Sequence, residues 1–390
     1  MEPGYNLYST ILLMGAVHGL LLALALLNTR SGNLVAHRIL AALTLVFAID
    51  LSDSFFLHAD YRAVGIWSSV VSESLDFLYG PLIYFYIRAL TEGEAFRLIG
   101  KHWLHFLPFA LSYLLFLPYF LLDADLKTEF VYGDVTSATA EYAPVVLVID
   151  IATLVSISLI GVYFTLSIRR LRRHAREIRD QFSYTERINL NWMRNLLIGL
   201  GIIFAVYLVA VFFSASLGLD DEIVNLLMLL VVILIYTMGY LGLRQPAIFS
   251  HHSDREDKAP TGKETETKKY RKSVLDSEMT GMLLSELKSY MAREKPYLDN
   301  TLTLPQLSRQ LDIPPHYLSQ VINERLKQNF FDFINRYRVD DAKQHLDNPE
   351  QAGKNILAIA LDSGFNSKSA FYTAFKKHTG MTPTQFKHSG

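Results

Sequence analysis

Five carboxylic acids lie inside long apolar stretches of the first 250 residues. They are Asp50, Asp53, Glu73, Asp76 and Asp150. The first four form two pairs spaced three residues apart, so each pair shares a helix face. No Lys or Arg stands at the same depth, and the nearest base is His18. An ionised side chain inside a bilayer costs about 3 kcal/mol or more unless it is paired or hydrated. The acids therefore predict an outward-facing sensing pocket for protons, a cation or a polar small ligand.

A purely structural role for these acids stays open. They could be protonated and hydrogen-bonded to neighbouring hydroxyls, namely Ser52, Ser54, Ser72 and Ser74. The chain has no cysteine, which excludes disulfides and thiolate metal sites. We find no motif of a metalloprotease, a phosphate-binding loop or a nucleophile elbow. The sequence therefore predicts no catalytic residue, no metal site and no cofactor.

The elements that carry the acids are apolar runs close to the ~20 residues that cross a bilayer. The predicted spans are Leu7–Asn28, Arg38–His58, Val64–Leu90, Trp103–Leu122, Ala143–Ile168, Trp192–Leu217 and Ile223–Leu243. The first run has no basic stretch ahead of it and is too long for a cleaved signal peptide. Residues 1–243 are thus expected to form a seven-helix transmembrane sensor domain.

Charge in the loops predicts the orientation of these spans. Basic residues mark the cytoplasmic side. Alternate loops are rich in them: Arg30, Arg38, Arg88, Arg97, Lys101, Arg169, Arg170, Arg172, Arg173, Arg176, Arg179 and Arg187. The other loops hold only Arg62 and Lys127 and are acidic. This predicts a multi-pass protein of a bacterial inner membrane, with its N-terminus outside and its C-terminal domain cytoplasmic. The arginines after residue 168 either anchor this topology and extend the fifth helix, or contact anionic lipid.

The last third of the chain has a different composition. From Arg271 onward the net charge is +3, against −4 for the preceding residues. Residues 244–275 are polar, with Pro260 and Gly262, and are expected to be a flexible cytoplasmic linker. Residues 276–390 show helical apolar spacing and are expected to fold as a soluble all-α domain.

Two segments of this domain have the pattern of a helix-turn-helix. In the first, 303–326, Thr303 should cap a short helix that Asp312 ends, before a second helix with Leu318 and Ile322 inward. The second, 355–378, repeats the apolar positions 52 or 53 residues later, which indicates an internal repeat. Between them, NFFDFINRYRVDDAKQHL should form a connecting helix.

The second segment and its continuation toward the C-terminus contain GFNSKSAFYTAFKKHTGMTPTQF, which resembles the signature of the AraC/XylS family of transcription regulators. The resemblance covers about the last 110 residues of the chain. It implies two helix-turn-helix units on one connecting helix and control of transcription. The first unit departs from the family at its turn, where Asp312 replaces the usual Gly; Asp tolerates the left-handed conformation. The apolar half resembles, diffusely, the seven-helix sensors of some bacterial regulators.

The direction in which a side chain points from its recognition helix predicts whether it meets DNA. Polar groups that point outward from a recognition helix can reach base edges, and basic groups nearby can reach phosphates. The predicted DNA-binding residues are His316, Ser319, Gln320, Asn323, Arg325, Lys327, Lys368, Ser369, Tyr372, Thr373, Lys376 and Lys377. For any single residue of this set, plain solvent exposure is the alternative.

Together these features predict an all-α, membrane-embedded one-component transcription regulator that is not an enzyme. Its expected partners are double-stranded DNA, the lipid bilayer and an unknown small ligand or cation. RNA polymerase and a second copy of the chain stay open as partners. The alternative function is a transporter or intramembrane enzyme with a regulatory DNA-binding tail, and a passive DNA tether is a third.

Overall fold

The computed structural model describes residues 5–132, 143–185, 188–217, 221–244, 277–348 and 353–389. Within these ranges the chain is helical and has no strand; one isolated antiparallel bridge joins Phe182 to Thr303. Its contacts divide it into two compact units. The first comprises residues 1–172 and 190–256, and the second comprises 173–189 and 257–390.

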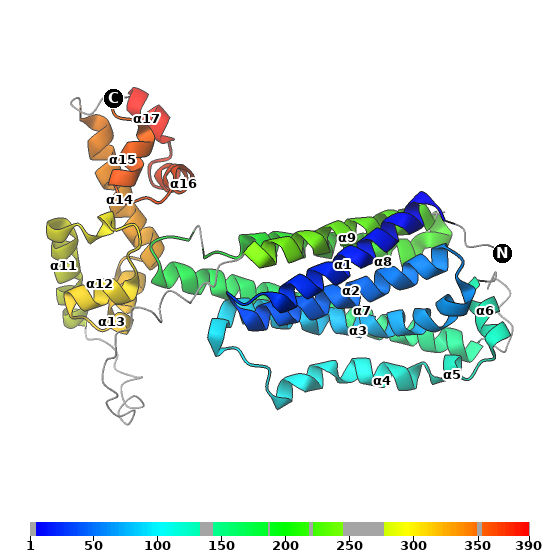
Figure 1. The fold of residues 1–390 in the computed structure, drawn as a ribbon. Helices are drawn as coiled ribbons and strands as arrows, with labels where there is room; N and C mark the ends of the chain where they lie inside the picture. Colours follow the sequence, from blue (N-terminus) through cyan, green and yellow to red (C-terminus); the bar gives the residue numbers. More distant parts are fainter. Residues whose placement is uncertain are drawn as a thin grey trace. The chain divides into compact units, whose positions relative to one another are not determined.

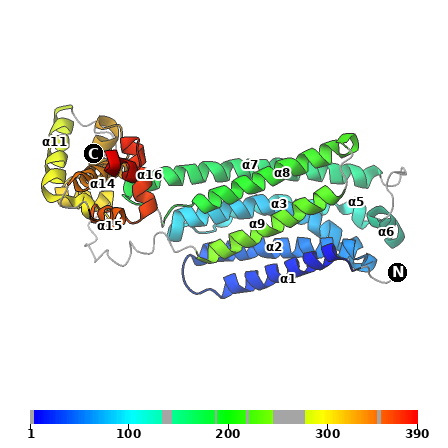
Figure 2. The same cartoon turned by 90° about the horizontal axis from the view of Figure 1, so that it is seen from above.

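Long helices lying side by side make up most of the first unit (Figures 1 and 2). Its described elements are α1 (Leu7–Asn28), α2 (Leu34–His58), α3 (Arg62–Glu92), η1 (Gly93–Ala95), η2 (Gly100–Phe106), α4 (Leu107–Leu115), α5 (Leu117–Phe120), α6 (Ala124–Tyr132), α7 (Ala143–Gln181, whose last turns belong to the second unit), α8 (Asn191–Leu217) and α9 (Asp221–Arg244).

Three of these helices are long and apolar enough to cross a membrane: α1, α2 and α7. The bounds of α1 are those predicted, and α7 runs past the predicted end at Ile168 through the arginine-rich segment. Helices also stand where the third, sixth and seventh spans were expected. The predicted total of seven spans is not confirmed by these three helices.

The predicted fourth span, Trp103–Leu122, is not one helix. It is divided among η2, α4 and α5. Pro108 and Pro118 lie in the first turns of α4 and α5, where a missing N–H is tolerated. Proline also disfavours helical geometry in the residue before it and cannot donate to the preceding turn. The apolar run is therefore divided into separate helical elements although its composition suits a single span.

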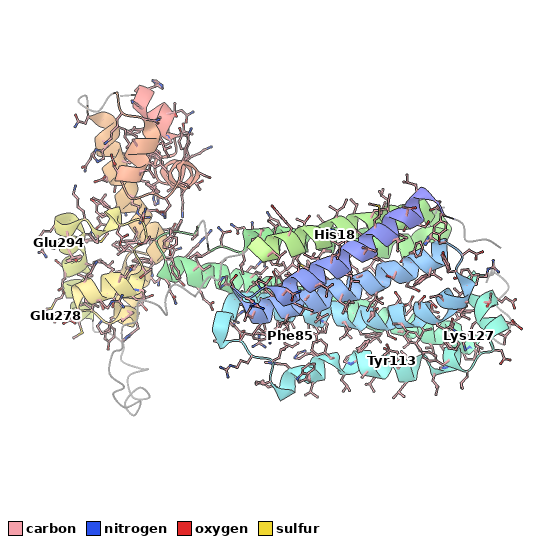
Figure 3. All side chains as sticks on the ribbon, in the orientation of Figure 1. His18, Phe85, Tyr113, Lys127, Glu278 and Glu294 are labelled. Atoms are coloured by element: carbon pink, nitrogen blue, oxygen red, sulfur yellow. The ribbon has the colours of Figure 1, made fainter. Side chains whose placement is uncertain are left out.

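The helix α6 was not predicted, because its residues appeared to be an outer loop. Its Lys127 is buried; the Nζ atom lies 4.3 Å from the centroid of the Trp67 ring and donates to the Phe120 carbonyl at 3.1 Å (Figure 3). A cation over an aromatic face is stabilising. Lys127 therefore packs within the first unit and is not a loop charge.

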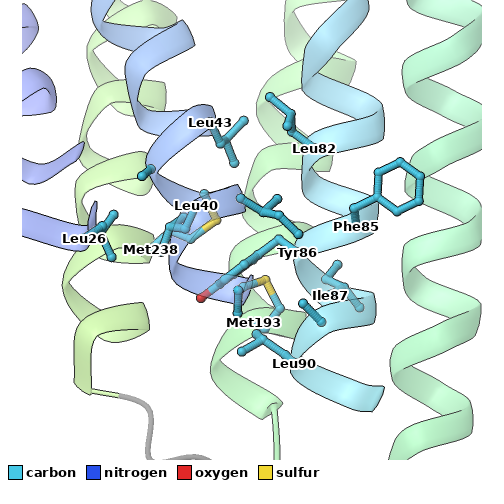
Figure 4. Packing of buried hydrophobic residues seen from close by; sticks show 14 of the residues in the cluster. Leu26, Leu40, Leu43, Leu82, Phe85, Tyr86, Ile87, Leu90, Met193 and Met238 are labelled. Atoms are coloured by element: carbon cyan, nitrogen blue, oxygen red, sulfur yellow. The ribbon is translucent and has the colours of Figure 1, made fainter. Parts of the chain in front are cut away.

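The core of the first unit is a layer of large apolar side chains. It includes Leu40 of α2, Tyr86 of α3, Met193 of α8 and Met238 of α9 (Figure 4). The outer face of α1 instead leaves large apolar side chains uncovered: Leu13, Leu20, Leu21, Leu24 and Leu27. Contiguous exposed apolar surface of this kind marks an interaction surface.

The second unit contains shorter helices, which the predicted repeat anticipates. They are α11 (Ser277–Glu294), η3 (Pro296–Leu298), α12 (Leu304–Leu311), α13 (Pro315–Gln320), η4 (Val321–Arg325), α14 (Phe330–Asp347), α15 (Ile356–Asp362), α16 (Lys368–Thr379) and α17 (Pro383–Ser389). Two apolar clusters, one for each helix-turn-helix, lie on either half of α14. The predicted linker, 244–275, lies outside the described residues except for Arg244.

Candidate nucleic-acid interface and acidic cluster

The first helix-turn-helix begins at a capped end. The Thr303 hydroxyl accepts from the backbone N–H of Gln306 at 3.3 Å, and the Gln306 side chain accepts from the backbone N–H of Thr303 at 2.7 Å. This reciprocal pair satisfies two backbone donors that a helix start leaves open. Asp312 ends α12 with φ 54°, the left-handed conformation that the sequence predicted for it. Both ends of the first helix are therefore set by local sequence.

The recognition helix of this unit consists of α13 and η4. Its inward side chains are Leu318, Val321 and Ile322, each about 1% exposed. Of the predicted DNA-binding residues, four are exposed and two are half-buried. The exposed residues are His316, Asn323, Arg325 and Lys327; the half-buried ones are Ser319 and Gln320. The Gln320 amide donates to the Glu324 carboxylate at 3.1 Å. A contact between the Gln320 amide and a base would replace this hydrogen bond to Glu324.

The second helix-turn-helix repeats the design with different caps. Asn355 caps α15, and Ser367 caps α16 by accepting from the Ala370 N–H at 3.2 Å. Phe371 and Phe375 are fully buried on the inner face of α16. Lys368, Ser369, Thr373, Lys376 and Lys377 point away from that face and are exposed, while Tyr372 is half-buried.

Two predicted DNA contacts of α16 already have partners inside the unit. The ammonium of Lys377 lies 2.6 Å from a carboxylate oxygen of Asp332 on α14. The Tyr372 hydroxyl lies 2.9 Å from that of Thr384 on α17. Both side chains therefore also hold α16 against neighbouring helices.

The connecting helix α14 carries a buried arginine on its apolar stripe. Arg338 is 1% exposed, and all three nitrogens of its guanidinium donate hydrogen bonds. The Nε atom donates to the Tyr297 carbonyl at 2.7 Å, and Nη2 donates to the Asp299 carbonyl at 2.8 Å. The other bonds reach Asn335 Oδ1 at 3.5 Å, Ser183 O at 2.9 Å and Ser183 Oγ at 3.0 Å. The guanidinium thus joins α14 to the η3 turn and to the segment after α7.

The η3 turn lies between the two motifs and fits closely against the second. Gly364, at the turn of the second motif, has φ +85°, and a Cβ added there would stand 2.5 Å from the Tyr297 carbonyl oxygen. The Asn366 side chain donates to the Asn300 carbonyl at 2.9 Å. Burial and the nearby Asp341 carboxylate raise the pKa of Tyr297 to about 12, so its hydroxyl stays a donor. The turn therefore fixes the two motifs relative to each other.

Sequence reasoning missed the buried polar residues of α14 that lie near the η3 turn. We call the contacts of Arg338 with the η3 turn and Ser183 the Arg338 joint. Asn335, Arg338 and Asp341 are buried, although only the apolar residues of α14 were expected to pack. A signal was available, because Arg338 stands four residues after Ile334 and four before Ala342, both on the packed stripe. A charged residue in the middle of an apolar helix face indicates a buried polar contact.

The predicted acidic residues are partly brought together. A carboxylate oxygen of Asp50 accepts from Ser72, and its other oxygen accepts from the Tyr79 hydroxyl at 2.9 Å. Ser68 donates to Asp53, which is 6% exposed. Asp76 is half-buried and Glu73 is exposed, and both interact electrostatically with Asp50. These four acids form what we call the α2–α3 acidic cluster; Ser68 and Tyr79 are partners that the sequence did not single out.

Two residues fall outside this cluster. Asp150 lies on α7 with an exposed side chain. His18 lies on α1, exposed, with its ring 4.5 Å from that of Tyr236 on α9 (Figure 3). Within the part of the chain that the structure describes, no group of three or more His, Cys, Asp or Glu could hold a metal ion.

Comparison with known proteins identifies the C-terminal part. The family described as "Helix-turn-helix domain" matches residues 307–389. The melibiose operon regulatory protein of Escherichia coli K12 is 28% identical over 89 residues, which are 23% of this chain and 28% of that protein. An uncharacterized HTH-type transcriptional regulator of Staphylococcus aureus is 34% identical over 86 residues, 22% of this chain and 11% of the relative. The similarity thus covers less than a third of either relative.

A solved structure is also similar to part of the chain. It is a protein of unknown function from Listeria innocua, 32% identical, with a TM-score of 0.24; the match covers 27% of this chain and 96% of that one. The C-terminal part of this chain carries a helix-turn-helix domain and is similar to proteins named as transcription regulators.

Proposed function

We propose that this protein is a membrane-embedded one-component transcription regulator. A signal received in the apolar half changes how the C-terminal domain binds a specific DNA site. The observation that carries the proposal is the presence, on one chain, of a helix-turn-helix domain and of three long apolar helices, α1, α2 and α7. The basic and acidic loops support a bacterial inner membrane, with the N-terminus outside and residues 277–389 in the cytoplasm.

The two motifs suit an asymmetric DNA site. Successive turns of the major groove on one face of DNA lie about 34 Å apart. Two recognition helices held on one connecting helix, α14, can enter adjacent turns from a single chain. The exposed polar side chains of α13 and α16 read base edges, while Arg325, Lys327 and Lys376 contact phosphates. A second copy of the chain and RNA polymerase are partners at the promoter in this proposal.

A pair of variants tests the DNA-facing assignment. Gln320→Ala and Lys368→Ala are each expected to weaken binding about 10-fold, because a good base or phosphate contact contributes about 1–3 kcal/mol. Lys288→Ala is the matched control, an exposed lysine on α11 that belongs to neither recognition helix. Gel-shift affinity for a duplex selected from a random library is the measurement. Unchanged affinity in both variants would remove these residues from the interface.

We further propose that the α2–α3 acidic cluster senses the signal. Its hydroxyl donors, Ser68, Ser72 and Tyr79, hold carboxyl groups between two helices, so a change in protonation or a bound polar ligand would alter the α2–α3 contact. The same hydrogen bonds also suit the structural alternative, in which protonated acids only hold the helices together.

Neutralising the cluster separates these roles. Asp50→Asn together with Glu73→Gln is expected to change reporter transcription about 5-fold while membrane insertion stays normal, since couplings of 1–3 kcal/mol are typical of such switches. Asp150→Asn is the control, an acid of similar predicted depth outside the cluster. Normal insertion with unaltered reporter output would leave the acids a packing role only.

A transporter or intramembrane enzyme with a regulatory tail is the second function to test. The acidic cluster is the feature that favours it. Uptake of substrate by a chain truncated after α9 would support this function, because transport would then proceed without the DNA-binding domain. A passive tether would bind DNA at the membrane and leave transcription unchanged under every condition.

A further inference from the structure

The segment that directly follows α7 is built into the DNA-binding unit. Phe182 and Ser183 come immediately after Gln181, the last residue of α7, and are 6% and 1% exposed. Phe182 pairs with Thr303, the cap of the first helix-turn-helix, in an antiparallel bridge. The Ser183 N–H donates to the Leu302 carbonyl at 3.2 Å. The segment therefore adds a short strand-like edge beside the start of α12.

Ser183 also takes two of the five hydrogen bonds of Arg338. Its carbonyl accepts at 2.9 Å and its hydroxyl at 3.0 Å. The remaining three bonds go to residues of the DNA-binding domain itself, and the guanidinium lies 5.9 Å from the Phe365 ring of the second motif. Charge-assisted bonds of this kind are about twice as strong as neutral ones. One side chain thus connects the end of α7, the connecting helix, the η3 turn and the second motif.

We propose that Phe182–Ser183 is a docking segment through which α7 controls the connecting helix of the DNA-binding domain. The inference deepens the proposed function by naming the route from the apolar half to the DNA. The contact involves few residues, and on release water can solvate the two donors that Ser183 leaves. Its net stability is therefore small, as a switch requires, because a signal can shift only equilibria close to balance.

The same geometry explains how a movement would be transmitted. A helix rises 1.5 Å per residue and is stiff along its axis, so a shift or rotation of α7 moves Phe182 and Ser183 with it. Either Arg338 follows, which displaces α14, or its bonds to Ser183 break. Both outcomes change the contacts of Arg338 that fix the two motifs relative to each other. No long linker is needed for this coupling.

The absence of natural cysteine permits a direct test of docking. Extended by two residues, the antiparallel register of the 182–303 bridge pairs Tyr184 with Thr301, and we choose these two positions for cysteines. In full-length chain in membrane vesicles, Tyr184→Cys with Thr301→Cys is oxidised, and the chain is then cut at a protease site inserted within 250–270. The control pair is Tyr184→Cys with Leu361→Cys, whose second position is exposed on α15.

Docking predicts that the two halves remain joined after the cut, with a yield about 10-fold above the control pair, because the docked contact raises the effective concentration of one cysteine at the other. Adding Ser183→Trp, too large for its buried site, should abolish the excess, while Gln181→Trp at the exposed neighbouring position should preserve it. Equal yields in the two pairs, or a covalent dimer in place of the joined halves, would overturn the proposal.

A second measurement tests whether the docking segment controls transcription, and not only whether it contacts the DNA-binding domain. Ser183→Trp is expected to change reporter transcription about 3-fold or more in either direction, in the range of ordinary allosteric coupling, while gel-shift affinity shows a folded DNA-binding domain. Gln181→Trp should leave transcription unchanged. Normal transcription in Ser183→Trp would overturn the control by α7. The cross-linking result does not depend on DNA binding, so failure of the proposed function is distinguishable from failure of docking.

Discussion

Gly364→Ala is expected to destabilise the C-terminal unit by about 3 kcal/mol, since it combines a strained backbone with a close contact. The glycine has φ +85°, and the new Cβ would lie 2.5 Å from the Tyr297 carbonyl oxygen and 3.0 Å from Leu298. Both neighbours are backbone atoms that cannot turn aside. The η3 turn would have to move away from the second motif. This movement would also disturb the hydrogen bonds between the η3 turn and Arg338.

Gly380→Ala is the matched control for this prediction. It shares the left-handed conformation, with φ +81°, but a Cβ there has nothing within 4 Å. Gly380→Ala should therefore reduce stability only through the strained backbone conformation, by about 1 kcal/mol. Urea unfolding of the C-terminal unit in the full-length chain, followed by pulse proteolysis, measures both. Equal losses for the two variants would show that the contact with η3 contributes nothing.

Arg338→Leu should cost the C-terminal unit about 4 kcal/mol. The change leaves the Tyr297 and Asp299 carbonyls, and the acceptors of Ser183, without their donors, and each buried unsatisfied group costs about 1–3 kcal/mol. The effect should reach both recognition helices, because the guanidinium connects α14 with the η3 turn.

The control for Arg338 stands two residues earlier on the same helix. Arg336 is exposed, so Arg336→Leu should change stability by no more than about 0.5 kcal/mol. Amide hydrogen exchange in α14 and η3 of the full-length chain reports the difference locally. If Arg338→Leu changed stability as little as Arg336→Leu, apolar contacts alone would hold α14 and the η3 turn together.

Local sequence was sufficient to predict the helix-turn-helix units. The Thr303 cap, the left-handed Asp312 and the inward Leu318 and Ile322 follow from preferences that act within a few residues. The two-motif repeat has the same origin, because each copy must bury its own apolar positions. The first apolar helix, Leu7–Asn28, was also predictable from length and composition alone.

The predictions that failed depended on contacts between distant segments or on competing local signals. The fourth predicted span breaks at Pro108 and Pro118, where proline geometry overrides apolar composition. Lys127 appeared as a loop charge because its partner, Trp67, lies 60 residues earlier in the chain. The bond between Ser183 and Arg338 joins residues 155 positions apart, and no periodicity encodes such a pairing.

The central claim, that one chain reads DNA from a membrane, can be tested without knowing the promoter. Vesicles carrying the full-length chain are mixed with a random duplex library and recovered by flotation, and the DNA that floats with them is sequenced over several rounds. We expect enrichment of a site with two short elements about one helical turn, or 10–10.5 base pairs, apart. Floating vesicles that carry no DNA, or DNA with no enriched sequence, would contradict the claim.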